Sequence, residues 1–203
     1  MLQLLRESKT YDVAFSGGVD STCALMYTRK FINRDAKALY FNHGDEYAHT
    51  TEEPHVVEFC KQHNVPLIIE RNTVPMIPGD SLEAYWRHWR YKFLMQHSND
   101  VATGHHLDDV AETYLFTTLH GVSKIISLRN GNIVRPFMLN RKYELESWCS
   151  KQGLNWLRDT NEAVAHRPRA KVREVLVPAA VEVHHGFMTT VRNMVRNKYQ
   201  HAV

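Results

Sequence analysis

The residues best suited to chemistry follow a short apolar run near the N-terminus. Residues 12–22 read Asp-Val-Ala-Phe-Ser-Gly-Gly-Val-Asp-Ser-Thr, which is the pattern of a strand, a tight turn and a helix N-terminus. Gly17 and Gly18 allow a turn that exposes consecutive N–H groups, and hydroxyl side chains add donors beside the positive end of the helix dipole. The pattern predicts a loop that binds the phosphates of a nucleotide through Ser16, Gly17, Gly18, Val19, Asp20, Ser21 and Thr22.

Asp20 is the unusual member of this loop. The loop has no Lys before its Ser and Thr, so it differs from the common G-x-x-x-x-G-K-S/T phosphate loop. A carboxylate placed where phosphates gather favours a magnesium ion between the two. We therefore expect Asp20 to be a metal ligand and Mg²⁺ to be a cofactor.

A second group of polar residues stands in the segment Gly-His-His-Leu-Asp-Asp-Val-Ala-Glu-Thr. On a helix, Asp108, Asp109 and Glu112 fall within about 100° of arc. The acids are expected to face a crevice and the opposite, apolar side to face a sheet. An acidic first turn that complements the helix dipole is an alternative. A transition-metal site with His105 and His106 is disfavoured, because adjacent helical residues do not share a face.

Two arginines form the third group. Arg87 and Arg90 lie three positions apart, and Glu83 lies four positions before Arg87. That spacing suits an intrahelical salt bridge. It equally suits a guanidinium that faces a phosphate or the charge developing in a reaction. Spacing alone does not choose between the two.

The pattern of apolar runs indicates which elements position these groups. Runs typical of strands cover residues 11–15, 36–41, 65–69 and 100–103. Helix-like stretches between and after them cover residues 21–32, 51–63 and 81–97. This alternation predicts an α/β fold, a doubly wound parallel sheet. Ligands of such sheets bind at the carboxyl ends of the strands, so His43, Gly104 and His105 are expected to join the nucleotide site.

The pattern weakens after residue 119. Helices are predicted at residues 142–151 and 187–201, and a short helix at 171–176 is expected to stop near Pro178. We expect a nucleotide-binding domain over residues 1–140. Residues 141–203 are expected to form a small helical C-terminal extension with a basic tail, packed on the same domain.

Composition limits the class of protein. The 203 residues are 43% hydrophobic and 23% charged, which suits one core. The chain has neither an apolar run near about 18 residues nor a signal-peptide pattern, so we expect a cytoplasmic protein without membrane contact. Cys23, Cys60 and Cys149 lack the spacing of a disulfide framework or a metal cluster. From Ala163 onward, seven Lys or Arg face two acids, which favours a polyanionic partner.

The motifs together resemble a known family. The Ser-Gly-Gly-Val-Asp-Ser loop at 16–21 is similar to the signature of the PP-loop ATP pyrophosphatase superfamily. Combined with Asn42-His43-Gly44, Glu83-Ala84-x-x-Arg87-x-x-Arg90-Tyr91, the segment 104–113 and Arg135-Pro136, it resembles the tRNA(Ile)-lysidine synthetase family.

Later segments extend the similarity to about residue 178. Asp159-Thr160-Asn161 is similar to an Asp-Ser-Asn element of that family, and Arg169-Ala170-Lys171-Val172-Arg173 to an Arg-Asn-x-Ile-Arg segment. Ala170 replaces the usual Asn, and Glu174 replaces a frequent His. These departures change the side chains that an RNA or a substrate would meet near this segment.

The resemblance implies a reaction. ATP would be cleaved between its α- and β-phosphates, the adenylyl group would go to the C2 oxygen of an anticodon cytidine in tRNA, and lysine would displace AMP. Asp109 and Glu112 would receive the lysine ammonium, and Arg87 would face the activated intermediate. The other substrate-binding residues would be Arg90, Asp108, Arg135, Arg169 and Arg173. The chain ends soon after this catalytic part, so whole-tRNA recognition would be reduced, left to the basic tail, or supplied by a second copy of the chain or a helper protein.

Two alternatives stay open. Another PP-loop chemistry, such as base thiolation, would need a sulfur relay, and the missing C-x-x-C motif argues against its cluster-dependent form. A non-catalytic, nucleotide-dependent tRNA-binding protein would not need the acids of the second group.

Overall fold

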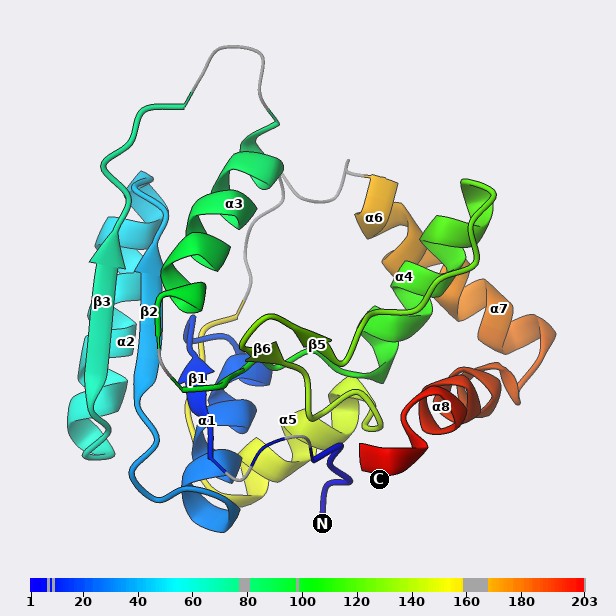
Figure 1. Cartoon of the computed structure of the whole chain (residues 1–203), viewed down its shortest axis with the longest axis horizontal. Helices are drawn as coiled ribbons and strands as arrows, with labels where there is room; N and C mark the ends of the chain where they lie inside the picture. The colour runs from blue at the N-terminus through cyan, green and yellow to red at the C-terminus, as the bar shows by residue number, and fades with distance from the viewer. Residues whose placement is uncertain (7, 9, 77–80, 98, 159–167, 203) are drawn as a thin grey trace.

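A parallel sheet forms the centre of the computed structural model, which describes residues 1–6, 8, 10–76, 81–97, 99–158 and 168–202. Within that part the sheet has six strands in the order β3-β2-β1-β4-β6-β5 (Figure 1). All neighbours are parallel except β5 and β6, which form an antiparallel hairpin. The strands are β1 (Asp12–Ala14), β2 (Ala38–Asn42), β3 (Leu67–Arg71), β4 (Val101–Ala102), β5 (Arg129–Asn130) and β6 (Ile133–Val134).

The predicted α/β fold is confirmed. The chain moves outward from β1 to β3 and then returns to place β4 on the other side of β1. This reversal creates a switch point between β1 and β4, where open parallel sheets bind their ligands. The phosphate loop follows β1 and the Gly-His-His segment follows β4, so both of them emerge at the switch point.

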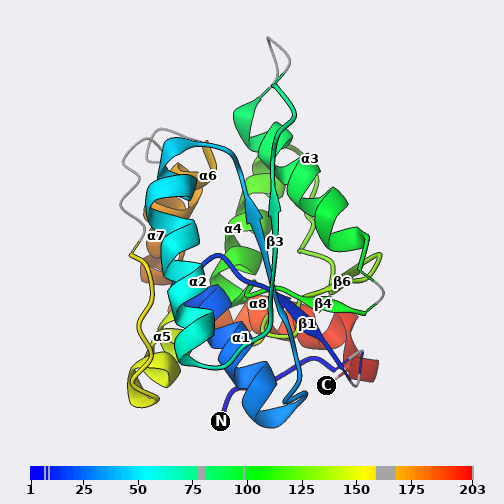
Figure 2. The same cartoon turned by 90° about the vertical axis from the view of Figure 1, so that its left-hand side faces the viewer.

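Helices cover both faces of the sheet, as Figure 2 shows with the sheet nearly edge-on. Side chains of α1 (Val19–Phe31), α2 (Glu53–Gln62) and α5 (Lys142–Lys151) share one buried cluster with β1. On the other face, α3 (Leu82–Met95) buries Phe93 and Leu94 against strand residues. A short π-helical segment, η1 (Ala48–Glu52), leads into α2.

The apolar side of α4 (Leu107–Leu119) was expected to face the sheet, and that expectation is wrong. Leu107, Val110 and Ala111 belong to a second buried cluster, whose other members come largely from the C-terminal helices. Those helices are α6 (Pro168–Lys171), the π-helical η3 (Val172–Leu176), α7 (Val177–Val183), α8 (Phe187–Lys198) and the 3-10 turn η4 (Gln200–Ala202). They supply enough apolar surface to turn α4 toward themselves.

The prediction of a helix that stops near Pro178 is also wrong. The chain runs from η3 directly into α7, and Pro178 stands in the first turn of α7. The π-helical turn η3 directly precedes Pro178 and already alters the hydrogen-bond ladder there, so the missing N–H of proline is accommodated. Among the described residues, no helix combines the length and apolar character that a bilayer crossing demands.

Candidate active site

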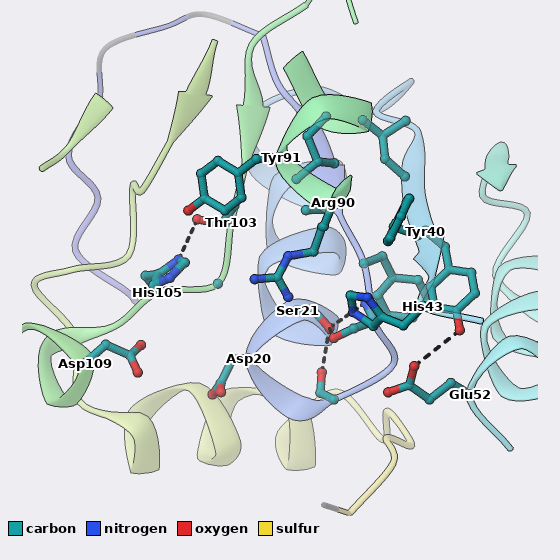
Figure 3. Close-up of a pocket in the computed structure, with 18 of the residues that line it drawn as sticks. Asp20, Ser21, Tyr40, His43, Glu52, Arg90, Tyr91, Thr103, His105 and Asp109 are labelled. Atoms are coloured by element: carbon teal, nitrogen blue, oxygen red, sulfur yellow. Dashed lines mark hydrogen bonds between the residues drawn. The ribbon is translucent and has the colours of Figure 1, made fainter. Parts of the chain in front are cut away.

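Three loops meet in one cavity at the carboxyl ends of β1, β2 and β4, as the sequence predicted (Figure 3). This first cavity has a volume of about 400 Å³. Its polar lining from these loops consists of Ser16, Gly18, Asp20, Ser21, His43, Thr103, Gly104 and His105. Apolar β2 residues, among them Leu39 and Phe41, line another part of it.

Internal hydrogen bonds hold the phosphate loop open. Gly17 adopts a φ of +79°, which favours glycine, and its carbonyl accepts a hydrogen bond from Leu157 N at 2.9 Å. Ser21 Oγ donates to Gly18 O at 2.9 Å and accepts from Ser16 N at 3.2 Å. Thr22 is buried, and its hydroxyl donates to Gly17 O at 3.4 Å, so that it supports the loop from inside.

Gly104 lets the β4–α4 loop lie directly against the start of α1. A Cβ at this position would stand 2.5 Å from Asp20 O, closer than carbon and oxygen can approach. This contact between backbones brings the side chain of Asp20 next to the first turn of α4. In Figure 3 the carboxylates of Asp20 and Asp109 face the same space.

The side chain of Asp20 lines the first cavity and is 35% exposed. Its Oδ1 is buried and accepts no hydrogen bond within the described part of the chain. The nearest basic atom is Nε2 of the buried His106, 3.6 Å away and beyond hydrogen-bond distance. An anionic oxygen without a donor fits a magnesium ion. Mg²⁺ commonly binds one or two carboxylates together with phosphates and water.

His106 was not among the predicted site residues. Its imidazole stands between Asp20 and the acids of α4, with Nδ1 3.5 Å from Asp109 Oδ2. Burial lowers the pKa of His106, but the surrounding carboxylates outweigh burial and raise it above its usual value. The Gly-His-His motif was the available signal, but it did not tell which of the two histidines would be enclosed by acids.

The two aspartates of α4 have different surroundings. Asp108 accepts from Arg141 Nε at 3.0 Å and from Lys142 N at 2.8 Å, so it ties α4 to the start of α5. Asp109 Oδ2 accepts from the backbone N of His106 at 2.9 Å in a capping box. Both acids therefore do stabilise the first turn of α4, and Asp109 also lines the first cavity.

Glu112 is engaged inside the protein. Its side chain is 4% exposed, and both of its oxygens are used: Oε1 accepts from Arg169 Nη1 at 3.0 Å and Oε2 from Arg173 Nε at 2.7 Å. Burial lowers the pKa of Arg173, but Glu112 and Asp109 outweigh that effect and raise it. The structure thus brings three predicted site residues together as an ion-pair network.

A second cavity of about 730 Å³ adjoins the first. The two share Arg90, His105, Asp109 and Arg173. The second cavity is rich in guanidinium groups, to which Arg87, Arg129, Arg135 and Arg169 also contribute. The five arginines of the predicted site, Arg87, Arg90, Arg135, Arg169 and Arg173, therefore all line this cavity.

Both arginines of α3 line the second cavity. Arg90 lines both cavities, and burial lowers the pKa of its guanidinium. Arg87 is more exposed and places its guanidinium over the ring of Tyr91, 4.5 Å from the ring centroid.

Two histidines of the first cavity are held neutral. Burial, with a contribution from Arg90, lowers the pKa of His43 to about 4. Burial likewise lowers the pKa of His105 to about 4. His105 Nδ1 lies 2.8 Å from Thr103 Oγ1, and the His43 ring packs against Trp86.

Sequence reasoning missed the residues that line the β2 side of the first cavity. Tyr40 donates to Glu52 Oε2 at 3.2 Å, and both line the cavity. Glu52 is the last residue of the π-helical turn η1, and no residue pattern in 48–52 predicts that geometry. The predicted Asp159-Thr160-Asn161 element lies outside the described residues.

Comparison with known proteins agrees with this geometry. Residues 1–180 match the family model described as the PP-loop domain. The tRNA(Ile)-lysidine synthase of Vibrio vulnificus (strain YJ016) is 28% identical over 194 residues, which are 89% of this chain and 44% of that protein. The Haemophilus ducreyi enzyme of the same name is 32% identical over 187 residues, 84% of this chain and 42% of its own. The chain thus spans less than half the length of these relatives.

Solved structures share the fold. The U34-tRNA thiolase NcsA from Methanococcus maripaludis superposes with a TM-score of 0.76 at 18% identity, covering 97% of this chain and 74% of that one. The NH3-dependent NAD synthetase from Campylobacter jejuni gives 0.54 at 13% identity, covering 96% and 85%. The resemblance that the motifs indicated is confirmed by the matching sequences: this chain belongs to the PP-loop domain family.

Proposed function

We propose that the protein is an ATP-dependent tRNA-modifying ligase. It transfers the adenylyl group of ATP to the C2 oxygen of a cytidine with release of pyrophosphate, and lysine then displaces AMP. One observation carries the proposal: a cavity with a phosphate loop and a cavity lined by arginines share a wall that contains Asp109 and Arg90. ATP and an RNA nucleotide can thereby meet at one point.

The first cavity would take ATP. The loop from Ser16 to Ser21 offers backbone N–H groups to the phosphates at the N-terminus of α1. The apolar wall from Leu39 to Phe41 suits the adenine base. Asp20 would hold Mg²⁺, which when bound supplies positive charge to the departing pyrophosphate.

The amine would enter a third cavity of about 490 Å³, on the α4–α5–α7 side of Asp20. Its acids include Asp20 and Asp109, its cations include Arg141 and Lys142, and Val177 and Val181 form an aliphatic wall. These features fit an amino acid whose ammonium lies at the acids and whose carboxylate lies at the cations. Lysine, with its aliphatic stem, matches all three parts.

The surroundings of Glu112 change the role suggested for it by the family resemblance. Because Arg169 and Arg173 already neutralise its carboxylate, we assign it to holding these two arginines at the second cavity. Asp109 is then the acid that receives the ammonium. Attack needs a free amine, so Asp109 would also accept the proton that the ammonium loses.

The test is a pyrophosphate-release assay with ATP, in which lysine and bulk tRNA are varied, followed by mass analysis of the nucleosides. Lysine-dependent release and a lysine-sized mass gain on cytidine are expected. A sulfur-sized gain would point to thiolation instead, although all three cysteines are buried and none lines the three cavities. An absence of release with every tRNA would favour the non-catalytic alternative.

A further inference from the structure

Arg135 is a buried cation with an unusual set of partners. The residue is 4% exposed, and it has no ion pair with any described carboxylate. Its Nη1 donates to Ser127 O at 2.6 Å and its Nη2 to Tyr91 Oη at 3.0 Å, while Nε has no partner in the described part of the chain. Burying a charge away from water without a neighbouring acid costs free energy, so stability alone does not account for the buried position of Arg135.

Tyr91 is the side chain that Arg135 holds. It belongs to α3 and lines the first cavity. Burial raises the pKa of Tyr91, but the charges of Arg135, Arg87 and Arg90 outweigh burial and lower it. The phenol oxygen accepts from the buried guanidinium, and this hydrogen bond holds the hydroxyl end of the Tyr91 ring in place.

Arg87 depends on that ring. Its guanidinium lies 4.5 Å from the centroid of Tyr91, and this is its one recorded partner among the described residues. An exposed arginine without further contacts would sample many rotamers. Stacking on a fixed aromatic ring restricts it to one direction at the second cavity.

We propose that Arg135 and Tyr91 are positioning residues that fix the guanidinium of Arg87 at the second cavity. This inference rests on the proposed function and on the role that the family resemblance implies for Arg87, which is to face the activated intermediate. It gives Arg135 a positioning role, carried by the bonds that its terminal nitrogens donate to Ser127 O and Tyr91 Oη.

The pair can be tested with the variants Tyr91→Phe and Arg135→Lys and with the double variant. Tyr91→Phe keeps the ring and removes the acceptor, and Arg135→Lys keeps the charge and removes the two-pronged donor. Each single variant loses one charge-assisted hydrogen bond, and we therefore expect kcat for pyrophosphate release to fall about 10-fold. The KM for ATP should stay within about twofold of the native value. The double variant is expected to be no slower than the slower single variant, because both changes break one unit.

Tyr85→Phe is the matched control. Tyr85 lies on the same helix, and its hydroxyl bonds Asn72 and Val74 away from the three cavities. Wild-type kcat is expected for this variant. Multiplicative losses in the double variant, or an unchanged kcat in Tyr91→Phe, would overturn the proposal.

A second measurement does not depend on turnover. The side-chain N–H signal of Arg87, assigned with Arg87→Lys, is expected to carry an upfield ring-current shift in the NMR spectrum of the native chain. Arg135→Lys should reduce that shift, and Tyr91→Ala should abolish it. If the native chain releases no pyrophosphate, the proposed function fails. The ring-current shift then still decides whether Arg135 and Tyr91 position Arg87. An unchanged shift in Arg135→Lys would refute that positioning role.

Discussion

Asp20 has a buried carboxylate oxygen that accepts no hydrogen bond among the described residues, beside a loop built for phosphates. Asp20→Asn preserves the shape of the side chain and removes the negative charge that a metal ion needs. We expect pyrophosphate release to fall at least about 100-fold, as expected when charge stabilisation in a transition state is lost. Circular dichroism and the melting temperature should match those of the native chain. Undiminished release in this variant would remove Asp20 from the mechanism.

Glu112 shows how a predicted binding residue serves the structure. Glu112→Gln removes the carboxylate that Arg169 and Arg173 share and leaves the two guanidinium groups beside a buried, uncharged amide. We expect the free energy of unfolding to fall by about 1–3 kcal/mol, because both arginines are partly exposed and can rehydrate. Urea denaturation measures the loss. Glu174→Gln, an exposed change on the neighbouring η3, is the control and should change little.

His43 and His105 make stability depend on pH. Each has a folded-state pKa of about 4 against an ordinary value of 6.5. Below pH 6.5 the unfolded chain therefore binds protons that the folded chain does not, so the free energy of unfolding falls as pH falls. From pH 7 to 5 we expect a loss of about 1–2 kcal/mol per ring. His106, with its raised pKa, acts in the opposite sense as pH rises above 6.5. Urea midpoints should show the loss, and the double variant His43→Gln/His105→Gln should flatten it.

At the scale of elements, the contact between the β4–α4 loop and α1 assembles the site. Gly104→Ala would force Asp20 O and the new Cβ apart by backbone movement. We expect nucleotide affinity to fall at least about 10-fold and stability by about 1–3 kcal/mol, as for overpacking of a rigid contact. Gly153→Ala is the control, because a Cβ at that position would meet no atom within 4 Å and the residue lies outside the three cavities. Its φ of +68° puts a modest strain on an alanine. It should lose some stability and keep nucleotide affinity.

Elements with a strong local signal could be predicted from the sequence. The strand-turn-helix at residues 12–31 was visible because apolar runs, glycines and hydroxyl residues act over a few positions. The partners of Glu112 were not, because Arg169 and Arg173 lie 57 and 61 residues away. The packing side of α4 also depended on distant helices. Contacts between segments far apart in the sequence decide these features, and no local pattern records them.

At the scale of the whole molecule, the C-terminal helices complete the structure in two places. Leu145 and Cys149 of α5 belong to the buried cluster that α1, α2 and β1 share, and α8 packs Val191 and Val195 against α4. We therefore propose that residues 1–140 and 141–203 unfold as one cooperative unit. Coincident transitions by tryptophan fluorescence and circular dichroism are expected in urea. Two separated transitions would contradict the proposal.

Some basic side chains of the molecule stabilise the fold, whereas others are exposed and available to bind a polyanion. Arg192 donates to Leu139 O and Arg196 to Gln3 Oε1, so they fasten α8 to the body. Lys92 and Lys171 are exposed and have no described carboxylate partner, although Lys92 Nζ lies 4.4 Å from the centroid of the Trp89 ring. They stand on α3 and α6, the helices that carry Arg87 and Arg169 of the second cavity. If tRNA crosses this cavity, Lys92→Ala and Lys171→Ala should each weaken its binding and lower the slope of log affinity against log salt by up to about 0.9. Filter binding over a series of salt concentrations measures the slope.

The double variant Arg192→Ala/Arg196→Ala is the control, and it should lower the urea midpoint instead of the salt slope. A salt slope that responds to this double variant and not to the lysine variants would place the RNA along α8 and not across the second cavity.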